Sequence, residues 1–203
     1  MVYKLSRQIK ITKLQGLKTF ETKELALISV FSSFWIVSEI YFGPMISQLT
    51  HIHGVIQRLI GWFLMLILAE LTGKFGRVTA MAIIASIATR IIRPMRIYAL
   101  FVGAGYILGG FIFDILYFFF RKRVCKRGCV GLYILGISVF SGTIAIIPYL
   151  TFKLLNLGMI GFMLWFPFYV PKMIKSIILN VIGTSIGISI LPKIQSYTAR
   201  LDK

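Results

Sequence analysis

The stretch RIYALFVGAGYILGGFIFDILYFFFRKRVCKR, residues 96–127, decides the fold class. Between Arg96 and the basic run that begins at Arg121, its only charged residue is Asp114. A helix needs about 20 apolar residues to cross the hydrocarbon core of a bilayer, and Lys and Arg accumulate in cytoplasmic loops. The stretch therefore predicts a membrane-spanning helix that ends at the cytoplasmic surface.

The composition of the whole chain agrees with this reading. Its 203 residues are 58% hydrophobic and 14% charged, with a mean hydropathy of +0.86, whereas soluble domains carry about 25% charged residues. The net charge of +17 fits anionic lipid headgroups and membrane topology better than nucleic acid. We expect an all-α integral membrane protein whose residues 1–203 form a single transmembrane domain, without nucleic acid as a partner.

Six apolar runs between turn signals predict six transmembrane helices. They cover residues 24–42, 54–71, 78–92, 96–120, 130–154 and 172–191. They make up a bundle over residues 24–192, between a basic amphipathic lead-in over 1–23 and a tail over 193–203.

Glycine and proline set the expected breaks between and within these helices. The first helix is expected to end at Gly43 and Pro44, before a polar loop over 45–53, and Pro148 is expected to kink the fifth. Residues 156–171 are rich in aromatic side chains but interrupted by glycine and proline. Because Trp and Tyr concentrate at the headgroup level, we expect this stretch to be an interfacial loop or a partial helix.

Counting basic residues orients the bundle. If the N-terminus lies inside, most of the 23 Lys and Arg residues fall in cytoplasmic segments. The positive-inside rule therefore predicts a multi-pass protein of the cell membrane with both termini in the cytoplasm. Arg90, Arg93 and Arg96 form an outer cluster against that rule, and the pattern leaves open whether they face a substrate or lipid headgroups.

Ionisable groups within the predicted spans are candidates for function, because they are costly to place in a membrane. Glu39 and Arg58 lie at similar depths near the outer ends of the first two spans. They are expected to form a structural ion pair or to contact a ligand. Glu70 and Asp114, near the cytoplasmic ends, are expected to pair structurally with basic residues there.

A second candidate region surrounds the start of the last span. Lys172 and Lys175 share a helical face, Asn180 lies deeper along the helix, and Trp165 and Tyr169 precede them. Aromatic rings above two lysines can cover a flat organic ligand, so these residues are predicted to bind substrate. The alternative is an interfacial aromatic belt with snorkelling lysines.

Small residues at helical spacing mark one face of the first span. Ala26, Ser29 and Ser33 fall at positions i, i+3 and i+7. Such a face lets another helix approach closely, so it is predicted to bind a partner protein. Packing inside the chain itself is the alternative.

Signs of catalysis or of a bound cofactor are weak. His51 and His53 lack a third metal ligand nearby, and Cys125 and Cys129 form a lone C-x3-C pair. Ser141 has no histidine in a span to activate it, and no phosphate-binding Walker loop is present. We therefore expect no enzyme activity, no cofactor and no metal, and any use of ATP would require a partner.

Three segments resemble the substrate-binding S components of energy-coupling-factor (ECF) vitamin transporters. They read ELALISVFSS over 24–33, GGFIFD over 109–114 and PFYVPKMIK over 167–175. The resemblance implies capture of a vitamin-like molecule near the outer face, under the loop over 43–53 and beside the segment over 165–175. It also implies a transmembrane coupling subunit, packed on the small-residue face, and a pair of cytoplasmic ATPases. Transport in that family involves toppling of the S component in the membrane.

The stretch over 58–88, with Gly61, Trp62 and Phe63 and a turn at Lys74, is loosely similar to the thiamin-precursor group of that family. A thiamin precursor is therefore the first expectation for the substrate. Two other classes of function remain open on the sequence alone. One is an intramembrane enzyme, and the other is a small structural or assembly protein of the membrane.

Overall fold

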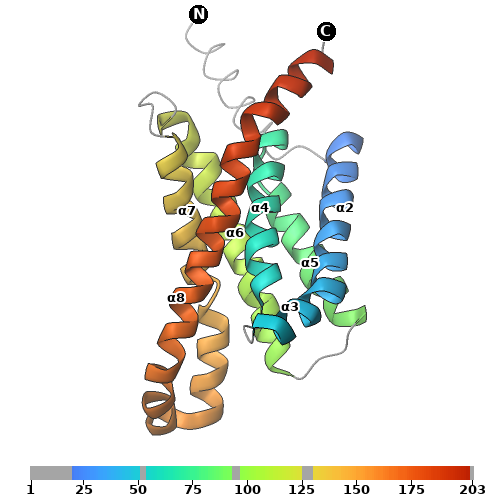
Figure 1. The fold of residues 1–203 in the computed structure, drawn as a ribbon. Coiled ribbons are helices and arrows are strands. Elements are labelled where there is room, and N and C mark those ends of the chain that lie inside the picture. The colour runs from blue at the N-terminus through green and yellow to red at the C-terminus, as the bar shows by residue number, and fades with distance from the viewer. Residues whose placement is uncertain (1–19, 51–53, 93–96, 125–129, 202–203) are drawn as a thin grey trace, which may run out of the picture.

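The computed structural model is a bundle of helices (Figure 1). It describes residues 20–50, 54–92, 97–124 and 130–201, and no β-strand occurs within these ranges. The elements, in chain order, are α2 (Thr22–Val37), the π-helical turn η2 (Ser38–Phe42), α3 (Gly43–Thr50), α4 (Val55–Thr72), α5 (Arg77–Ile92), α6 (Tyr98–Val124), α7 (Val130–Ile144) and α8 (Ile147–Leu201).

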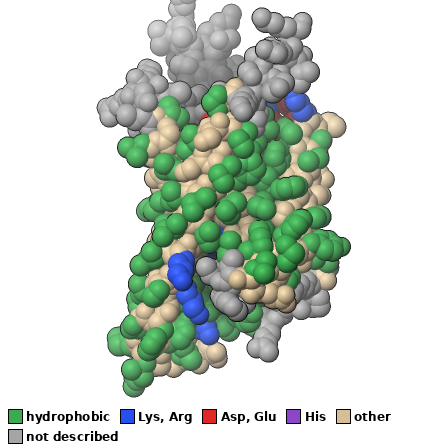
Figure 2. All heavy atoms as spheres, viewed as in Figure 1, with side chains coloured by type: hydrophobic (Ala, Val, Ile, Leu, Met, Phe, Trp, Pro, Cys, Tyr) green, Lys and Arg blue, Asp and Glu red, His purple; other side chains and the backbone are tan. Residues whose placement is uncertain are grey.

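Four helical stretches of the described residues are long and apolar enough to cross a membrane. They are Thr22–Leu49, Val55–Thr72, Tyr98–Phe120 and Val130–Pro192. Hydrophobic side chains dominate the face of the molecule drawn in Figure 2, and charged ones are sparse on it. The predicted all-α class is confirmed for the described residues, and the four stretches are consistent with a membrane protein.

The first helix does not end where the sequence suggested. Gly43 keeps right-handed helical angles, and the π-helical turn η2 leads directly into α3, so residues 45–50 are helical and not a loop. Pro44 lies in the first turn of α3, and because it has no N–H it leaves one carbonyl of the preceding turn without its helical donor. The wider π-helical turn of η2 changes the direction of the helix just before Pro44.

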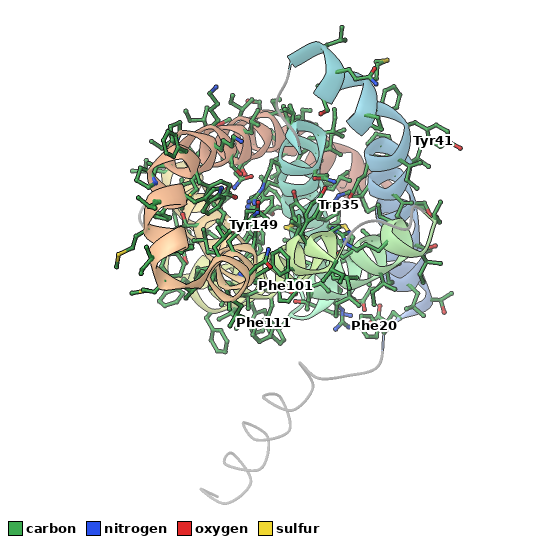
Figure 3. All side chains as sticks on the ribbon, turned by 90° about the horizontal axis from the view of Figure 1, so that it is seen from below. Phe20, Trp35, Tyr41, Phe101, Phe111 and Tyr149 are labelled. Carbon is green, nitrogen blue, oxygen red and sulfur yellow. The ribbon has the colours of Figure 1, made fainter. Side chains whose placement is uncertain are left out.

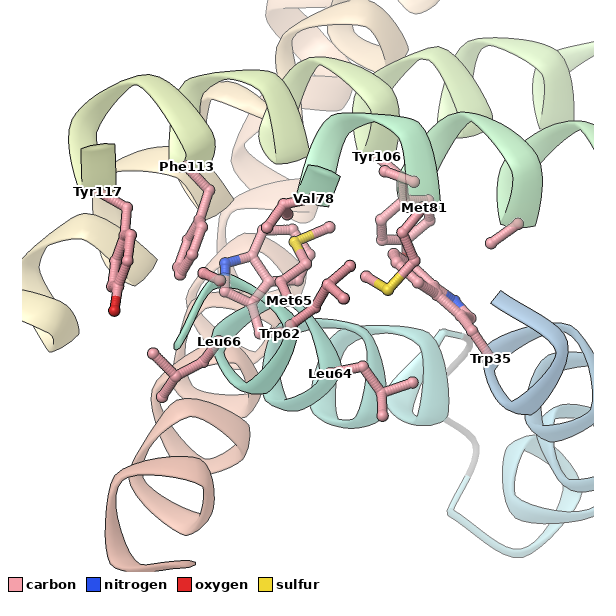
Figure 4. Close-up of a cluster of buried hydrophobic side chains, with 14 of the residues drawn as sticks. Trp35, Trp62, Leu64, Met65, Leu66, Val78, Met81, Tyr106, Phe113 and Tyr117 are labelled. Carbon is pink, nitrogen blue, oxygen red and sulfur yellow. The ribbon is translucent and has the colours of Figure 1, made fainter. Parts of the chain in front are cut away.

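Helix α4 lies at the centre of the bundle. It packs most extensively against α8 and also contacts α2, α3, α5 and α6. Trp62, Met65 and Leu66 on α4 are completely buried, beside Trp35 of α2 and Tyr106 of α6 (Figure 4). This core has aromatic, methionine and leucine side chains in tight contact, which fixes the helices that carry the polar residues described below.

Glycine permits the closest approaches between helices. A Cβ atom at Gly183 of α8 would collide with the backbone carbonyl of Leu59 on α4, and one at Gly105 of α6 would collide with the carbonyl of Ala145. Small residues at membrane-helix interfaces allow such backbone contact. The central α4–α8 interface therefore depends on a residue without a side chain.

The C-terminal third of the chain forms a helical hairpin. Helix α7 ends at Ile144, and Pro148 lies in the first turn of α8, so the break predicted near this proline comes just before it. Within α8, Gly158 adopts φ 68° and ψ 175°, and there the chain reverses direction (Figure 1). The two arms, residues 147–157 and 159–201, lie side by side at the lower end of Figure 1.

This hairpin corrects two expectations. Residues 159–171 are helical despite Pro167 and Pro171, so the stretch predicted as an interfacial loop or partial helix is interrupted only at Gly158. Both prolines lie on the exposed side of the helix. The last helix also runs on to Leu201, through most of the predicted tail.

Candidate functional site

Charged side chains gather at the two ends of the bundle. The first group, here called the upper cluster, lies where α2 begins and α4 ends, at the top of Figure 1. Its members are Glu21, Glu24, Lys74, Arg77 and Asp114.

The upper cluster is built around a buried ion pair. Arg77 donates from Nη2 and Nε to Glu24 Oε2, at 2.7 and 3.1 Å, and both side chains are at most 7% exposed. Lys74 lies 2.5 Å from Glu24 and 2.6 Å from the exposed Glu21. Hydrogen bonds to these two carboxylates raise the pKa of Lys74 above its usual range. Each of these four charges therefore has an opposite charge within reach.

Asp114 completes the upper cluster from α6. Its Oδ2 accepts hydrogen bonds from the amides of Gly76 and Thr79 and from the Thr79 hydroxyl, at 2.9 to 3.1 Å. These amides open α5, where an acidic side chain is favourable. Asp114 is thus structural as expected, but it caps another helix, and within the described ranges it forms no ion pair with the basic residues that were predicted to be its partners. Glu70 accepts a hydrogen bond from Tyr117.

The second group, here called the lower cluster, lies towards the opposite end and comprises Glu39, Gln57, Arg58, Arg90 and Tyr106. Glu39 is 4% exposed, accepts a hydrogen bond from Gln57 and lies 3.9 Å from Arg90. Tyr106, which is 3% exposed, donates to Gln57 Oε1 at 3.1 Å. Helices α4, α5 and α6 and the turn η2 thus each place polar groups in one buried region.

Arg90 faces inward. Its guanidinium donates to the carbonyls of Ala99 and Ser86, at 3.0 and 2.8 Å, in addition to its pairing with Glu39. A Cβ atom at Gly103 would collide with the Arg90 side chain, so this glycine makes room for it between α5 and α6. Among the three arginines of the predicted outer cluster, Arg90 therefore serves the interior, while Arg93 and Arg96 lie outside the described residues.

Arg58 occupies a different position from the one expected. Its guanidinium carbon lies 5.4 Å from the Trp62 ring centroid and 5.1 Å from that of Tyr106, and Nη1 donates to the Gly142 carbonyl at 3.3 Å. The ion pair of Glu39 is formed with Arg90. Within the described ranges, no carboxylate forms an ion pair with Arg58.

Aromatic side chains of the hairpin form a further group of rings near the lower cluster. Trp165 stacks on Tyr169 with a centroid distance of 4.7 Å, and Tyr149 on the other arm contacts both rings. Tyr169 interacts electrostatically with Arg58 and Tyr106 of the lower cluster. Seen from below, Tyr149 lies between the hairpin and the rest of the bundle, whereas Tyr41 points outward (Figure 3). We call Tyr149, Phe162, Trp165 and Tyr169 the hairpin aromatics.

Asn180 lies in the interior beside the lower cluster. It is completely buried, and neither Nδ2 nor Oδ1 has a hydrogen-bond partner. A Cβ atom at Gly142 would collide with Asn180 Nδ2, so the amide lies directly against the residue whose carbonyl accepts from Arg58. A buried amide without partners costs about 1–3 kcal/mol.

The structure separates the residues predicted around the last span. Trp165 and Tyr169 face each other beside the lower cluster, and Asn180 is buried. Lys172 and Lys175 are exposed and therefore do not share a face with Asn180. The rings and the amide belong to one region, and the two lysines point to the surface.

The predicted partner face is open. Ala26, Ser29 and Ser33 are all exposed on α2, whereas the neighbouring Ser32 is 1% exposed and donates to the Met81 carbonyl at 3.4 Å. The alternative of packing inside the chain is therefore wrong for these three residues. Their role in binding a partner stays a prediction.

The remaining candidates from the sequence concern metal binding. His51, His53, Cys125 and Cys129 lie outside the described residues. In the described part of the chain, no group of three or more metal-ligating side chains occurs. An open apolar groove of about 420 Å³ lies between α5, α6 and the start of α8, but its lining contains no charged residue.

Sequence reasoning missed Gln57, Tyr106 and Lys153 as members of this region. Lys153 lies 5.4 Å from the Trp165 centroid and 5.9 Å from that of Tyr149. Gln57 precedes the flagged Arg58, and Tyr106 falls among glycines in an apolar span. The sequence signal that could have identified Tyr106 is a phenol flanked by glycines within an apolar span. Glycines at such positions make room for large side chains between helices.

Comparisons with known proteins found no relative. No protein family matches the chain, and neither curated proteins nor solved structures give a significant match.

Proposed function

We propose that this chain is the substrate-binding subunit of an importer of the energy-coupling-factor type, and that it captures a vitamin or similar small organic molecule. The observation that carries the proposal is the lower cluster. It contains a guanidinium without a carboxylate partner in the described ranges, beside a stacked pair of aromatic rings and a buried amide without partners. Ionisable groups facing the interior of a membrane bundle are typical of substrate sites.

We further propose six membrane spans, with both termini in the cytoplasm of the cell. The spans would be α2, α4, α5, α6, the pair formed by α7 and the first arm of α8, and the second arm of α8. The distribution of Lys and Arg supports this orientation. With it, the upper cluster lies near the cytoplasm and the lower cluster lies in the outer half.

A topology experiment can test this arrangement directly. A cysteine introduced at Gln48, which is exposed on α3, should react with a membrane-impermeant thiol reagent added to intact cells. Cys125 should react only after the membrane is permeabilised. Reversed labelling would contradict the proposed orientation.

The partners proposed for this subunit are a transmembrane coupling protein and a pair of cytoplasmic ATPases. The exposed face of Ala26, Ser29 and Ser33 supports this, because small residues on an outward helix face permit a second helix to pack closely. In this proposal the chain has no enzyme activity of its own. ATP hydrolysis by the partners would supply the energy for uptake.

The proposed function is tested on the purified chain. Protein prepared in an uncharged detergent is denatured, the released small molecules are identified by mass spectrometry, and their affinities are measured by isothermal titration calorimetry alongside a vitamin panel. The proposal predicts one vitamin-like compound that binds the chain. It is contradicted if no small organic compound is retained and no member of the panel binds.

A further inference from the structure

We propose that the ligand of this site is a planar organic anion, with a carboxylate or phosphate group bound by Arg58 and a ring stacked on the hairpin aromatics. This inference rests on the proposed function and specifies the chemical class of its substrate. Three independent features of the region lead to it: its charge balance, the geometry of Arg58 and the position of Asn180.

The charge balance of the region is positive. Glu39 is its only carboxylate among the described residues, and that carboxylate already pairs with Arg90 and accepts from Gln57. Arg58 and Lys153 contact aromatic rings and form no ion pair in the described ranges. Two half-buried cations without counter-charges among the described residues favour an anion that enters from outside.

The geometry of Arg58 leaves donors for such an anion. Of its five N–H groups, one on Nη1 bonds the Gly142 carbonyl, and the plane lies near the Trp62 and Tyr106 rings. A guanidinium matches the two oxygens of a carboxylate or phosphate in a bidentate arrangement. The two rings hold the fork in position, which lowers the entropy lost when an anion binds.

Asn180 supplies a further polar group next to Arg58. Its side-chain amide is completely buried and has no partner among the described residues, although the nearby hydroxyls of Ser138 and Thr184 donate to the Asn180 backbone carbonyl. Buried polar atoms without partners are rare and call for a specific explanation. A ligand that accepts from Nδ2 would satisfy this amide at the same place where Arg58 binds the anion.

A cationic ligand, such as a thiamin precursor, fits the region poorly. It would meet Arg58, Lys153 and Arg90, and the carboxylate of Glu39 that could attract it is engaged by Arg90 and Gln57. The stacked pair of Trp165 and Tyr169 accommodates a flat ring of either charge. The charges, and not the rings, therefore decide between the two classes.

The experiment uses probes that differ only in charge. The full chain in dodecyl maltoside is titrated by calorimetry with nicotinate, benzoate and 4-aminobenzoate, and with the neutral amide of each acid. Benzylamine serves as the cationic probe. In a second arm, the chain is placed in nanodiscs of phosphatidylcholine with or without phosphatidylglycerol, and binding of the acids is measured again, to distinguish a soluble anion from a lipid headgroup.

The variants are Arg58→Gln, Lys153→Gln and the matched control Lys23→Gln, which removes an exposed positive charge at the other end of α2. At least one acid should bind and its amide should not. Arg58→Gln should weaken that binding roughly 10- to 100-fold, and Lys153→Gln several-fold. Lys23→Gln should retain the wild-type affinity. Lys153 is half-buried, and its replacement by Gln is therefore expected to leave the fold intact. Lys153→Gln thus still tests the site if Arg58→Gln fails to fold.

Three outcomes would overturn the inference. If an amide or benzylamine binds as tightly as the acids, the site does not select anions, although the proposed function survives. If phosphatidylglycerol abolishes binding of every acid, or if no acid binds, the anion of the site is not a soluble planar acid. If acids bind equally to wild type, Arg58→Gln and Lys153→Gln, they bind elsewhere. Failure of the proposed function would instead appear as the absence of any retained or bound organic compound.

Discussion

The upper and lower clusters contain the same kinds of charged side chain, but they differ in how far those charges are paired within the chain. In the upper cluster, Glu24 faces both Arg77 and Lys74, and Asp114 caps α5. In the lower cluster, Glu39 pairs with Arg90, and Arg58 forms no ion pair with the carboxylates of the described ranges. Charges that are fully compensated within the chain hold helices together. Charges that the chain leaves uncompensated are available to a ligand.

The difference also appears in the surrounding amides. Backbone N–H groups at the start of α5 are satisfied by Asp114. Beside the lower cluster, the side-chain amide of Asn180 is buried without a partner among the described residues. Proteins tolerate such unsatisfied groups chiefly at functional sites, where stability is sacrificed for binding. The comparison therefore predicts that substitutions in the two clusters have opposite effects on stability and on binding.

The largest effect is expected when the upper ion pair is broken. Glu24→Gln leaves Arg77 buried beside a neutral amide, which should cost about 3–5 kcal/mol of unfolding free energy. Unfolding in mixed micelles of dodecyl maltoside and SDS measures this loss. The control is Glu21→Gln, whose carboxylate is 67% exposed and which should cost less than about 1 kcal/mol. Equal losses for both variants would mean that burial of Glu24 contributes nothing.

A smaller loss is expected at the interface that fixes the lower cluster. In Gly183→Ala the added methyl group would press on the Leu59 carbonyl, one residue after Arg58, and should cost about 1–3 kcal/mol. Gly136→Ala is the matched control, because a Cβ atom there meets no other atom within 4 Å. It should leave stability unchanged or raise it by less than about 1 kcal/mol. The same mixed-micelle unfolding distinguishes the two glycines.

Removing a hairpin ring should affect binding and not stability. Trp165→Ala removes the stacking partner of Tyr169, which should weaken the ligand identified by calorimetry several-fold, or about 1 kcal/mol. Phe168→Ala is the control, since Phe168 is 79% exposed on the same helix. If both variants retain wild-type affinity, the hairpin aromatics are not part of the site.

The smallest effect on folding is expected on the outer face of α2. Ser33→Leu should change the unfolding free energy of the isolated chain by less than about 0.5 kcal/mol, because this residue is exposed. It should nevertheless abolish co-purification with the proposed coupling subunit. Ser32→Leu, at a position that is 1% exposed, should destabilise the isolated chain itself. Assembly that survives Ser33→Leu would contradict the proposed role of this face.

Hydrophobic runs and basic loops were enough to predict the class of fold and the approximate limits of most helices. The errors came from local breaks that tertiary packing overrides. Pro44 lies in the first turn of α3, which continues directly from η2, and Pro167 and Pro171 lie inside α8 although both are exposed. The true reversal, at Gly158, is a single glycine among several in the same stretch.

The candidate site could be predicted only in part. Glu39 and Arg58 were singled out because ionisable groups in spans are costly. Trp165, Tyr169 and Asn180 were singled out because they lie around the lysines that open the last predicted span. Which of these side chains contact one another depends on the rotation of each helix about its axis. The sequence predicts that rotation only where one face of a helix is clearly polar. The pairing of Glu39 with Arg90 was missed for this reason, since Arg90 ends a short helix with small residues on several sides.

The central claim, that Arg77 is a structural charge and Arg58 is one kept for a ligand, is tested most directly by one measurement. The unfolding temperatures of ligand-free Arg77→Met and Arg58→Met are compared with that of the wild type in the same detergent. Arg77→Met should lower the unfolding temperature by several degrees, because Glu24 then loses its buried partner. Arg58→Met should leave it unchanged or raise it, because an uncompensated charge is removed. A loss in Arg58→Met as large as that in Arg77→Met would contradict the account.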